Sequence, residues 1–329
     1  MQVTQHARLS VAPMMDWTDR HCRYFHRLMS RQTLLYTEMV TAPAVLNGDR
    51  ARLLAFDPAE HPVALQLGGS DPAELGRAVR AVREFGYAEI NLNIGCPSDR
   101  VQSGCFGAVL MRRPELVAEC VAAMSGESPV EVTVKCRIGV DEQEPHEALP
   151  RFLEAMVGAG VKWVTIHARK AWLAGLSPKQ NRDVPPLDYA LVHDMKRAFP
   201  GLHISINGGI ATLDQAQAQL DAGIDGVMIG RAAYHTPAEV LLQADQRLFG
   251  ATTSPQLAED IPLKMLPYID AHLHAGGRLN QITRHMLGLF ANRPGARAWR
   301  RVLSEGAHKD GAGPALVERA LAEVVARAA

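Results

Sequence analysis

Residues 89–98 read Glu-Ile-Asn-Leu-Asn-Ile-Gly-Cys-Pro-Ser, an apolar run that leads directly into a loop with one cysteine. The run predicts a buried β-strand over residues 87–93. Gly95 and Pro97 favour a turn, so Cys96 is expected in a loop at the end of that strand. Loops on rigid scaffolds often carry functional groups. A thiol in this place can donate a proton, attack an electrophile or bind a metal, and the rest of the sequence has to distinguish these roles.

The same strand pattern occurs eight times between residue 8 and about residue 235, and helix-period stretches separate most of the strands. Buried apolar strands that alternate with helices are typical of parallel sheets. Eight such units match a (β/α)8 TIM barrel of the α/β class in number and length. A doubly wound open sheet is the alternative, but the sequence lacks the G-x-G-x-x-G turn that such a sheet would carry after its first strand.

The predicted strands are residues 9–14, 34–39, 63–67, 87–93, 130–136, 163–168, 203–206 and 226–229. The predicted helices are residues 18–29, 72–85, 114–124, 146–159, 188–199 and 213–222. Residues 249–255 resemble a linker, and residues 262–329 have a helical pattern with breaks at 276–277, 294–295 and 311–314. We therefore expect a barrel domain over residues 1–248 and a small helical bundle over residues 249–329.

Composition excludes several classes of protein. The formal net charge of the 329 residues is zero, so no overall field attracts the chain to a membrane or to nucleic acid. No apolar run approaches about 18 residues and no secretion signal precedes the first strand, so a cytoplasmic protein without membrane contact is expected. Five cysteines without a C-x-x-C pair disfavour a disulfide framework and a structural zinc site. We expect no metal, and we expect a monomer.

The predicted bundle has an uneven charge. Between Arg278 and Lys309 seven basic residues stand against Glu305 alone, which gives a local charge of +6 (seven minus one) over 32 residues. Charges on a solvated helix face usually mix both signs. A single sign at this density favours a surface for an anionic partner. The basic residues are Arg278, Arg284, Arg293, Arg297, Arg300, Arg301 and Lys309.

Polar residues follow most of the predicted strands. In a (β/α)8 barrel the C-terminal ends of the strands surround the active site. Each polar residue alone has a structural explanation, such as a solvated lysine or a turn, but together, in phase with the strand ends, they predict a ligand site. The residues are Gln66, Asn93, Lys135, His167, Arg169, Asn207 and Arg231.

The residues after the seventh and eighth predicted strands indicate the class of ligand. Barrels often bind phosphate there, and Asn207-Gly208-Gly209 and Gly230-Arg231 offer bare backbone and a cation. Lys135 and Gln66 on other strands suggest a broad planar group across the mouth of the barrel. A lysine near a flavin ring stabilises the negative charge that develops on reduction, so FMN satisfies both demands. A simple sugar phosphate would explain the glycine loops alone.

The motifs, taken in order, closely resemble those of the tRNA-dihydrouridine synthases, and most of all their A subfamily. The resemblance covers nearly the whole chain, and the N-L-N-x-G-C-P motif around Cys96 is its most specific part. The matching segments are residues 12–16 (A-P-M-M-D), 66–69 (Q-L-G-G), 91–97 (N-L-N-I-G-C-P), 134–137 (V-K-C-R), 167–169 (H-A-R), 207–210 (N-G-G-I) and 283–290 (T-R-H-M-L-G-L-F).

This resemblance implies a flavin-dependent oxidoreductase in which FMN and NADPH drive reduction of the uracil 5,6 double bond in tRNA, at D-loop uridines 20 and 20a. Cys96 would be the proton donor. The residues that would hold FMN are Pro13, Met14, Met15, Gln66, Lys135, His167, Asn207, Gly208, Gly209, Gly230 and Arg231. Those that would contact tRNA are Asn93, Lys179, Arg182, Arg297 and Arg300. Cys136 receives no role.

Elementary chemistry agrees with these roles. A thiol has an unperturbed pKa of about 8.5 and is mostly protonated at neutral pH, which suits an acid better than a nucleophile. A nucleophile would need an activating base beside it, and the loop supplies none. The glycine-rich stretch 98–107 is expected to be a mobile lid. Because a uridine in folded tRNA must leave its stack, phosphate contacts from the basic bundle would offset that cost.

Two other functions remain open on the sequence alone. A flavin barrel could act on a small molecule such as an enone or a free pyrimidine, although it would not need the basic bundle. An RNA-binding or folding helper without catalysis is the other possibility, but the presence of Cys96, Lys135 and His167 disfavours it.

Overall fold

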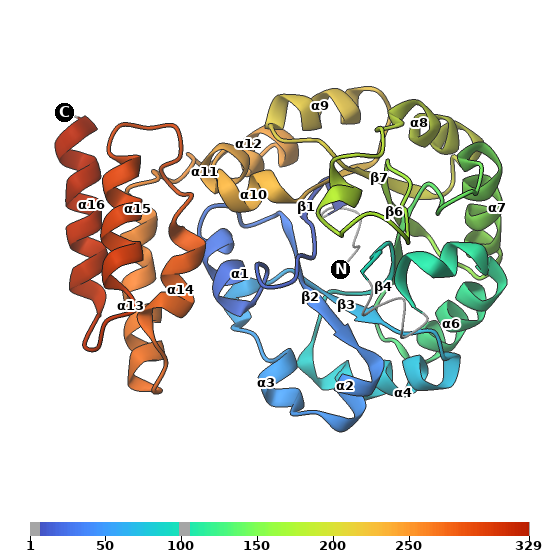
Figure 1. The fold of residues 1–329 in the computed structure, drawn as a ribbon, viewed down its shortest axis with the longest axis horizontal. Coiled ribbons are helices and arrows are strands. Elements are labelled where there is room, and N and C mark those ends of the chain that lie inside the picture. Colours follow the sequence, from blue (N-terminus) through green and yellow to red (C-terminus); the bar gives the residue numbers. More distant parts are fainter. Residues whose placement is uncertain (1–6, 99–105, 329) are drawn as a thin grey trace.

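The computed structural model describes residues 7–98 and 106–328, and a closed barrel of eight parallel strands lies at its centre (Figure 1). The strand β1 pairs with both β2 and β8, which closes the ring. The predicted (β/α)8 barrel is confirmed and the open sheet is wrong. The strands are β1 (Leu9–Val11), β2 (Leu34–Thr41), β3 (Val63–Gly68), β4 (Glu89–Ile94), β5 (Val132–Arg137), β6 (Trp163–His167), β7 (His203–Asn207) and β8 (Gly226–Ile229).

Helices surround the barrel, and all six predicted ones are present with ends that differ by a few residues. The α2 and α3 helices between β2 and β3, and the three helices after β8, were not predicted because each has only five or six residues. The helices of the barrel are α1 (Arg20–Arg27), α2 (Ala42–Asn47), α3 (Arg50–Leu54), α4 (Pro72–Val82), α6 (Pro114–Glu127), α7 (Pro145–Gly158), α8 (Tyr189–Ala198), α9 (Leu213–Asp221), α10 (Arg231–His235), α11 (Pro237–Leu241) and α12 (Ala244–Phe249). Short 3₁₀ helices cover Pro58–Glu60, Arg83–Phe85, Gly107–Arg112 and Gln180–Arg182.

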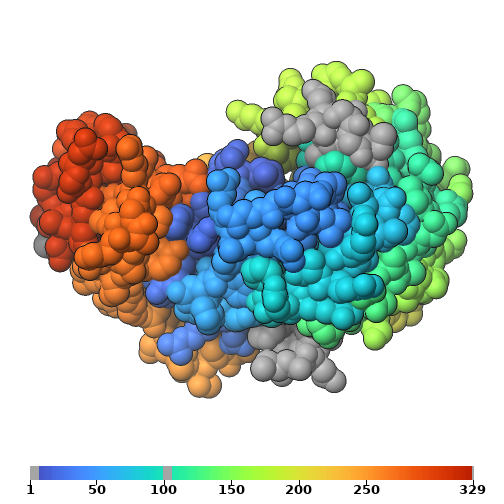
Figure 2. All heavy atoms as spheres, turned by 90° about the horizontal axis from the view of Figure 1, so that it is seen from below, coloured from blue at the N-terminus to red at the C-terminus, as the bar shows by residue number. Residues whose placement is uncertain are grey.

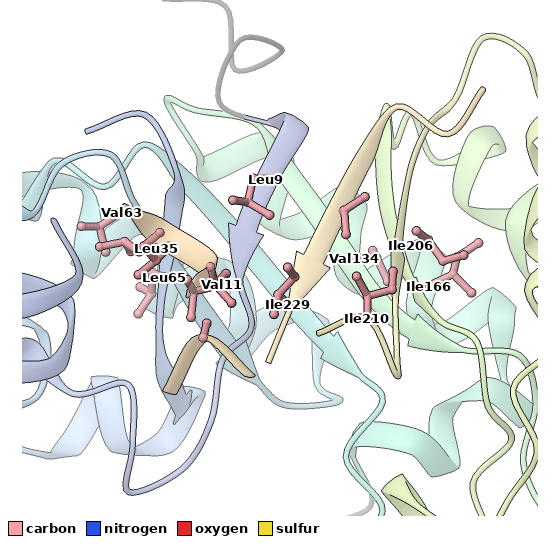
Figure 3. Packing of buried hydrophobic residues seen from close by; sticks show 14 of the residues in the cluster. Leu9, Val11, Leu35, Val63, Leu65, Val134, Ile166, Ile206, Ile210 and Ile229 are labelled. Atoms are coloured by element: carbon pink, nitrogen blue, oxygen red, sulfur yellow. The ribbon is translucent and has the colours of Figure 1, made fainter. Parts of the chain in front are cut away.

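Side chains alternate along each strand between two different environments. One set packs outward against the helices in a continuous apolar layer, to which Leu65, Val134 and Ile166 belong (Figure 3). Cys136 lies in this outer layer too. The other set points into the barrel and is largely polar yet buried. It includes Ser10, Tyr36, Glu89, Asn91, Thr133, Thr165 and Ser205.

The remaining helices form a bundle beside the barrel (Figure 1). They are α13 (Asp260–His274), α14 (Leu279–Met286), α15 (Ala296–Gly306) and α16 (Pro314–Ala328). The predicted breaks fall at the junctions between these helices. The predicted domain boundary between residues 248 and 249 falls just before the last residue of α12. None of the described helices is long and apolar enough to cross a bilayer.

The bundle contacts the barrel where α14 packs against α1, and ion pairs cross this contact. Asp19 caps the first turn of α1, and its carboxylate lies 2.6 Å from Arg284 Nη2 and 3.1 Å from His285 Nε2. Burial alone would raise the pKa of Asp19, but its bonds to His285, Cys22 and Arg284 hold that pKa well below the usual value. The carboxylate therefore stays charged and fixes α14 to the barrel.

Candidate active site

The register of the strands brings the predicted flavin-binding residues together. Lys135 is the register partner of Asn93 on one side, and His167 is the partner of both Arg137 and Asn207. All these positions lie at the C-terminal ends of their strands, where barrels bind ligands. The polar ring expected from the sequence is therefore a single cluster at the mouth of the barrel.

Lys135 is positioned by a short hydrogen-bonded chain. Its Nζ donates to Asn207 Oδ1 at 3.1 Å, and Asn207 Nδ2 donates to the carbonyl of Met228 at 2.7 Å. Burial, and to a lesser degree the charge of Arg137, lowers the pKa of Lys135 to about 8. The ammonium group carries no carboxylate partner among the described residues, so an anionic ligand would be its natural counter-ion.

His167 is neutral and is surrounded by cations. Burial lowers its pKa well below the usual value, and the charges of Arg137, Lys135, Arg169 and Arg182 act in the same direction. Four basic side chains thus contribute positive potential at one uncharged imidazole. Such a potential favours an electron-rich or anionic ligand, as the phosphate and reduced ring of a flavin would be.

Two glycines after β7 leave bare backbone next to this cluster. Gly208 has φ 113° and Gly209 has φ 71°, conformations that L side chains rarely adopt. A Cβ on Gly208 would lie 2.6 Å from His167 Cδ2, and one on Gly209 would lie 2.6 Å from a methyl group of Leu187. Only glycine fits at either position, so the backbone can approach a ligand closely there.

A chain of buried side chains runs from the barrel interior to the Cys96 loop. Glu89 accepts from the hydroxyls of Tyr36 and Thr133, and Thr133 in turn accepts from Asn91 Nδ2 at 2.7 Å. Asn91 Oδ1 accepts from Gln66 Nε2 at 2.8 Å. Burial raises the pKa of Glu89 to about 7. Since Thr133 donates to the carboxylate, the chain fixes which way each amide points.

The chain ends on the backbone of the loop that carries Cys96. Asn93 Nδ2 donates to Gln66 Oε1 at 2.8 Å, and Asn93 Oδ1 accepts from the backbone N–H groups of Gly95 and Cys96, both at 3.0 Å. The Asn93 side chain is therefore largely occupied in shaping the loop. One of its N–H groups has no partner among the described residues and could still meet a substrate, as predicted.

Cys96 is partly exposed at the mouth of the barrel. Its carbonyl accepts from the N–H of Ala108 at 3.0 Å, and its Sγ contacts Ser98 Oγ at 3.5 Å. Among the described residues no histidine or carboxylate hydrogen-bonds the sulfur. The thiol thus lacks the neighbouring base that a nucleophile needs, and it remains suited to donate a proton. Residues 99–105 of the predicted lid lie outside the described part of the chain.

Arg137 and Asn181 are organising residues that the sequence did not single out for the site. The buried guanidinium of Arg137 donates to three backbone carbonyls, those of Gly95, Lys170 and Asn181, at 2.9–3.0 Å. It therefore ties the Cys96 loop to the segment after β6. Hydrogen bonds to main-chain carbonyls of distant loops cannot be predicted from a sequence. The only sequence signal for Arg137 is its position at the end of a strand.

The remaining residues predicted to contact the flavin lie at the same mouth of the barrel, but fewer hydrogen bonds hold them in place. Met15 is 56% exposed, and the N–H of Met14 is held by Thr18 Oγ1 at 2.9 Å, which orders the loop that Pro13 opens. Gly230 immediately precedes α10. Arg231 pairs with Asp183 at 2.7 Å, so this expected phosphate contact already has a carboxylate partner.

The predicted tRNA contacts lie on two separate surfaces. Lys179 and Arg182 are exposed on the segment after β6, and Arg297 and Arg300 are exposed on α15 of the bundle. Arg297, Arg300 and Arg301 form no ion pair with any residue of the described ranges. Figure 2 shows the surface hollowed between the bundle, orange to red, and the yellow-green part of the barrel.

Comparisons with known proteins agree with the geometry. A family model described as dihydrouridine synthase matches residues 10–325. A protein of Shewanella oneidensis is 58% identical over 315 residues, which cover 96% of this chain and 93% of that protein. One of Vibrio cholerae is 55% identical over 323 residues, 98% of either chain, and one of Xanthomonas axonopodis pv. citri is 56% identical over 314 residues, 95% of this chain and 93% of that one. All three are named tRNA-dihydrouridine(20/20a) synthase.

Proposed function

The chain belongs to the dihydrouridine synthase family, and from this we propose that it is a flavin-dependent oxidoreductase that reduces uridines 20 and 20a in the D-loop of tRNA. The observation that carries the proposal is the mouth of the barrel. There the loop of Cys96 lies next to the Lys135–Asn207 pair and the neutral His167, on strands that follow one another around the ring.

The residues at the mouth fit FMN. Lys135 and His167 would face the ring system, and Gln66 would add a polar contact from β3. The glycine backbone at 208–209 and the turn at Gly230-Arg231 would hold the phosphate. When bound, the flavin supplies a hydride to C6 of the uracil, with NADPH as the source of electrons. The positive charges around His167 favour the electron-rich form of the ring.

Cys96 completes the reduction by donating its thiol proton to C5 of the uracil. The S–H bond breaks, a C5–H bond forms, and the hydride and the proton together saturate the 5,6 bond. A positioned acid contributes about 10²–10⁴-fold to such a step. Since Cys96 is partly exposed, solvent can return a proton to the thiolate after each turnover. The amide of Asn93 fixes the loop from which the thiol acts.

Arg297 and Arg300 would bind phosphates of the tRNA, with Lys179 and Arg182 nearer the target. These contacts would offset the few kcal/mol needed to turn a uridine out of its stack. We place the reaction in the cytoplasm and assign it to a monomer that uses no metal.

Two measurements on the purified protein test this function. The protein should be yellow and should reduce uridine in unmodified tRNA when NADPH is supplied, as nucleoside mass spectrometry would show. A colourless protein that fails to take up FMN on titration would refute it. Equal reduction of free uridine or of a small enone would instead assign the site to a small-molecule substrate.

A further inference from the structure

Trp172, in the segment after β6, is unusually placed. Its side chain is 39% exposed, and it is the only aromatic one among the large exposed apolar residues of the described chain. Tryptophan buries a large area when it binds. The exposed part of the ring could therefore contribute substantially to the binding of a partner.

The backbone of Trp172 is held rigidly. The buried side chain of Asn181 accepts from the N–H of Trp172 at 2.7 Å and donates to its carbonyl at 2.8 Å, and it also donates to the carbonyl of Leu176 at 3.1 Å. The direction of the Cα–Cβ bond of Trp172 is thus set before any ligand arrives. Only the two side-chain torsions of the indole remain to be fixed on binding, so the loss of conformational entropy is limited.

The same contacts link Trp172 to the catalytic loop. Arg137 donates to the carbonyl of Asn181 and to that of Gly95, both at 2.9 Å. Two residues, Asn181 and Arg137, therefore connect the backbone of Trp172 to the backbone beside Cys96. A base stacked on the indole would be held by a segment that is tied to the Cys96 loop.

The surroundings of Trp172 select the class of occupant. Between residues 169 and 183 the basic residues Arg169, Lys170, Lys179 and Arg182 stand against Asp183 alone, a net charge of +3 (four minus one). Lys170 Nζ lies 5.2 Å from the centre of the indole. An exposed aromatic ring among cations is the combination that binds single-stranded nucleic acid, because bases stack on the ring while phosphates meet the charges.

We propose that Trp172 is a stacking site for the base of a tRNA nucleotide that flanks the target uridine. The inference rests on the proposed function, since it assumes that the target uridine enters the mouth next to Cys96. Turning that uridine out removes a stacking partner from its neighbour. The indole replaces the lost partner and so stabilises the opened D-loop in the position that the chemistry needs.

Kinetics with substituted Trp172 test the inference. Trp172→Ala should raise the apparent KM for tRNA about 5- to 150-fold, which corresponds to ~1–3 kcal/mol per stacked base. The kcat at saturating tRNA, the flavin content and the rate of flavin reduction by NADPH should stay near those of the wild type. Trp172→Phe should restore most of the affinity, whereas Trp172→Leu, which keeps apolar bulk without a π face, should not. Val184→Ala, which shortens another exposed apolar residue of the same segment, serves as the matched control.

A second arm identifies the base. Unmodified tRNAs with a single abasic nucleotide at each position flanking the target uridine should bind the wild type more weakly at one position. The abasic nucleotide at that position should cause no further loss of affinity in Trp172→Ala. The inference would be overturned if the abasic nucleotide and Trp172→Ala weakened binding additively at every position. Equal affinities of Trp172→Phe and Trp172→Leu for tRNA would also overturn it. Absence of tRNA reduction by the wild-type enzyme would instead overturn the proposed function on which it depends.

Discussion

At the scale of single residues, burial has different consequences for the two basic groups at the mouth of the barrel. The pKa of His167 is so far below its usual value that the imidazole stays neutral at physiological pH. The pKa of Lys135 is lowered only to about 8, because burial and Arg137 disfavour its charge. Lys135 is therefore the group whose charge changes just above neutrality.

This predicts how flavin binding depends on pH. Lys135 loses its proton as the pH rises through about 8, so the apoprotein should bind FMN more weakly above that pH than below it. In Lys135→Arg the charge persists at high pH, and the decrease should be much smaller. Quenching of flavin fluorescence measures both affinities. A wild-type affinity that stays constant between about pH 7 and pH 9 would show that the charge of Lys135 is not used.

The sequence predicted where the candidate site residues lie better than it predicted their contacts. Lys135, His167 and Asn207 could be recognised because each ends a strand, and strand ends meet in a barrel. The ion pair of Arg231 with Asp183 could not be foreseen, since the two residues come from different loops. Asn181 was missed for a similar reason, because its role consists of bonds to nearby main chain within an irregular segment.

At the scale of elements, each strand and the loop after it form a unit. Inward side chains of β3, β4 and β5 bond one another, so the Cys96 loop is shaped by residues buried inside the barrel. The strands were predictable because their outward positions are apolar. The sequence analysis treated the strands as uniformly apolar and so did not predict the polar side chains at their inward positions. The α2 and α3 helices were missed since neither is long enough to show a helical period.

The loop after β7 provides a prediction at this scale. Gly208→Ala should lose bound FMN, because the new Cβ would lie 2.6 Å from the ring of His167. Gly223→Ala is the matched control, since Gly223 has a similar φ of 96° but no atom within 4 Å of the added Cβ. The control should lose about 1–2 kcal/mol of stability and keep its flavin. Flavin content per chain and thermal unfolding distinguish the two, and equal flavin content in both variants would contradict a close approach at Gly208.

At the scale of the whole molecule, the bundle is fixed to the barrel and exposes part of its positive charge. Arg284 pairs with Asp19 and Arg293 pairs with Glu259, so two of the seven basic residues counted in the sequence stabilise the fold. The local charge alone could not distinguish these from the exposed ones. Arg297 and Arg300 on α15 remain available for a partner, and the surface between bundle and barrel is hollowed (Figure 2).

Charge reversal on α15 tests whether its exposed arginines bind the tRNA. Arg297→Glu combined with Arg300→Glu should raise the apparent KM for tRNA about tenfold or more, with flavin content unchanged, because two phosphate contacts become repulsive. The slope of log KM against log salt concentration should decrease by about one for each lost phosphate contact. Arg77→Glu on α4, which lies at the lower edge of the barrel and apart from the bundle in Figure 1, should leave both quantities unchanged. If the double variant behaves like this control, the bundle does not bind the RNA.

The proton transfer from Cys96 is best tested by comparing Cys96→Ala with Cys136→Ala, which removes a thiol from the outer apolar layer. Both variants should bind flavin and accept electrons from NADPH. We expect dihydrouridine formation in tRNA to fall about 10²–10⁴-fold in Cys96→Ala and to persist in Cys136→Ala. Full turnover of tRNA by Cys96→Ala would contradict the account.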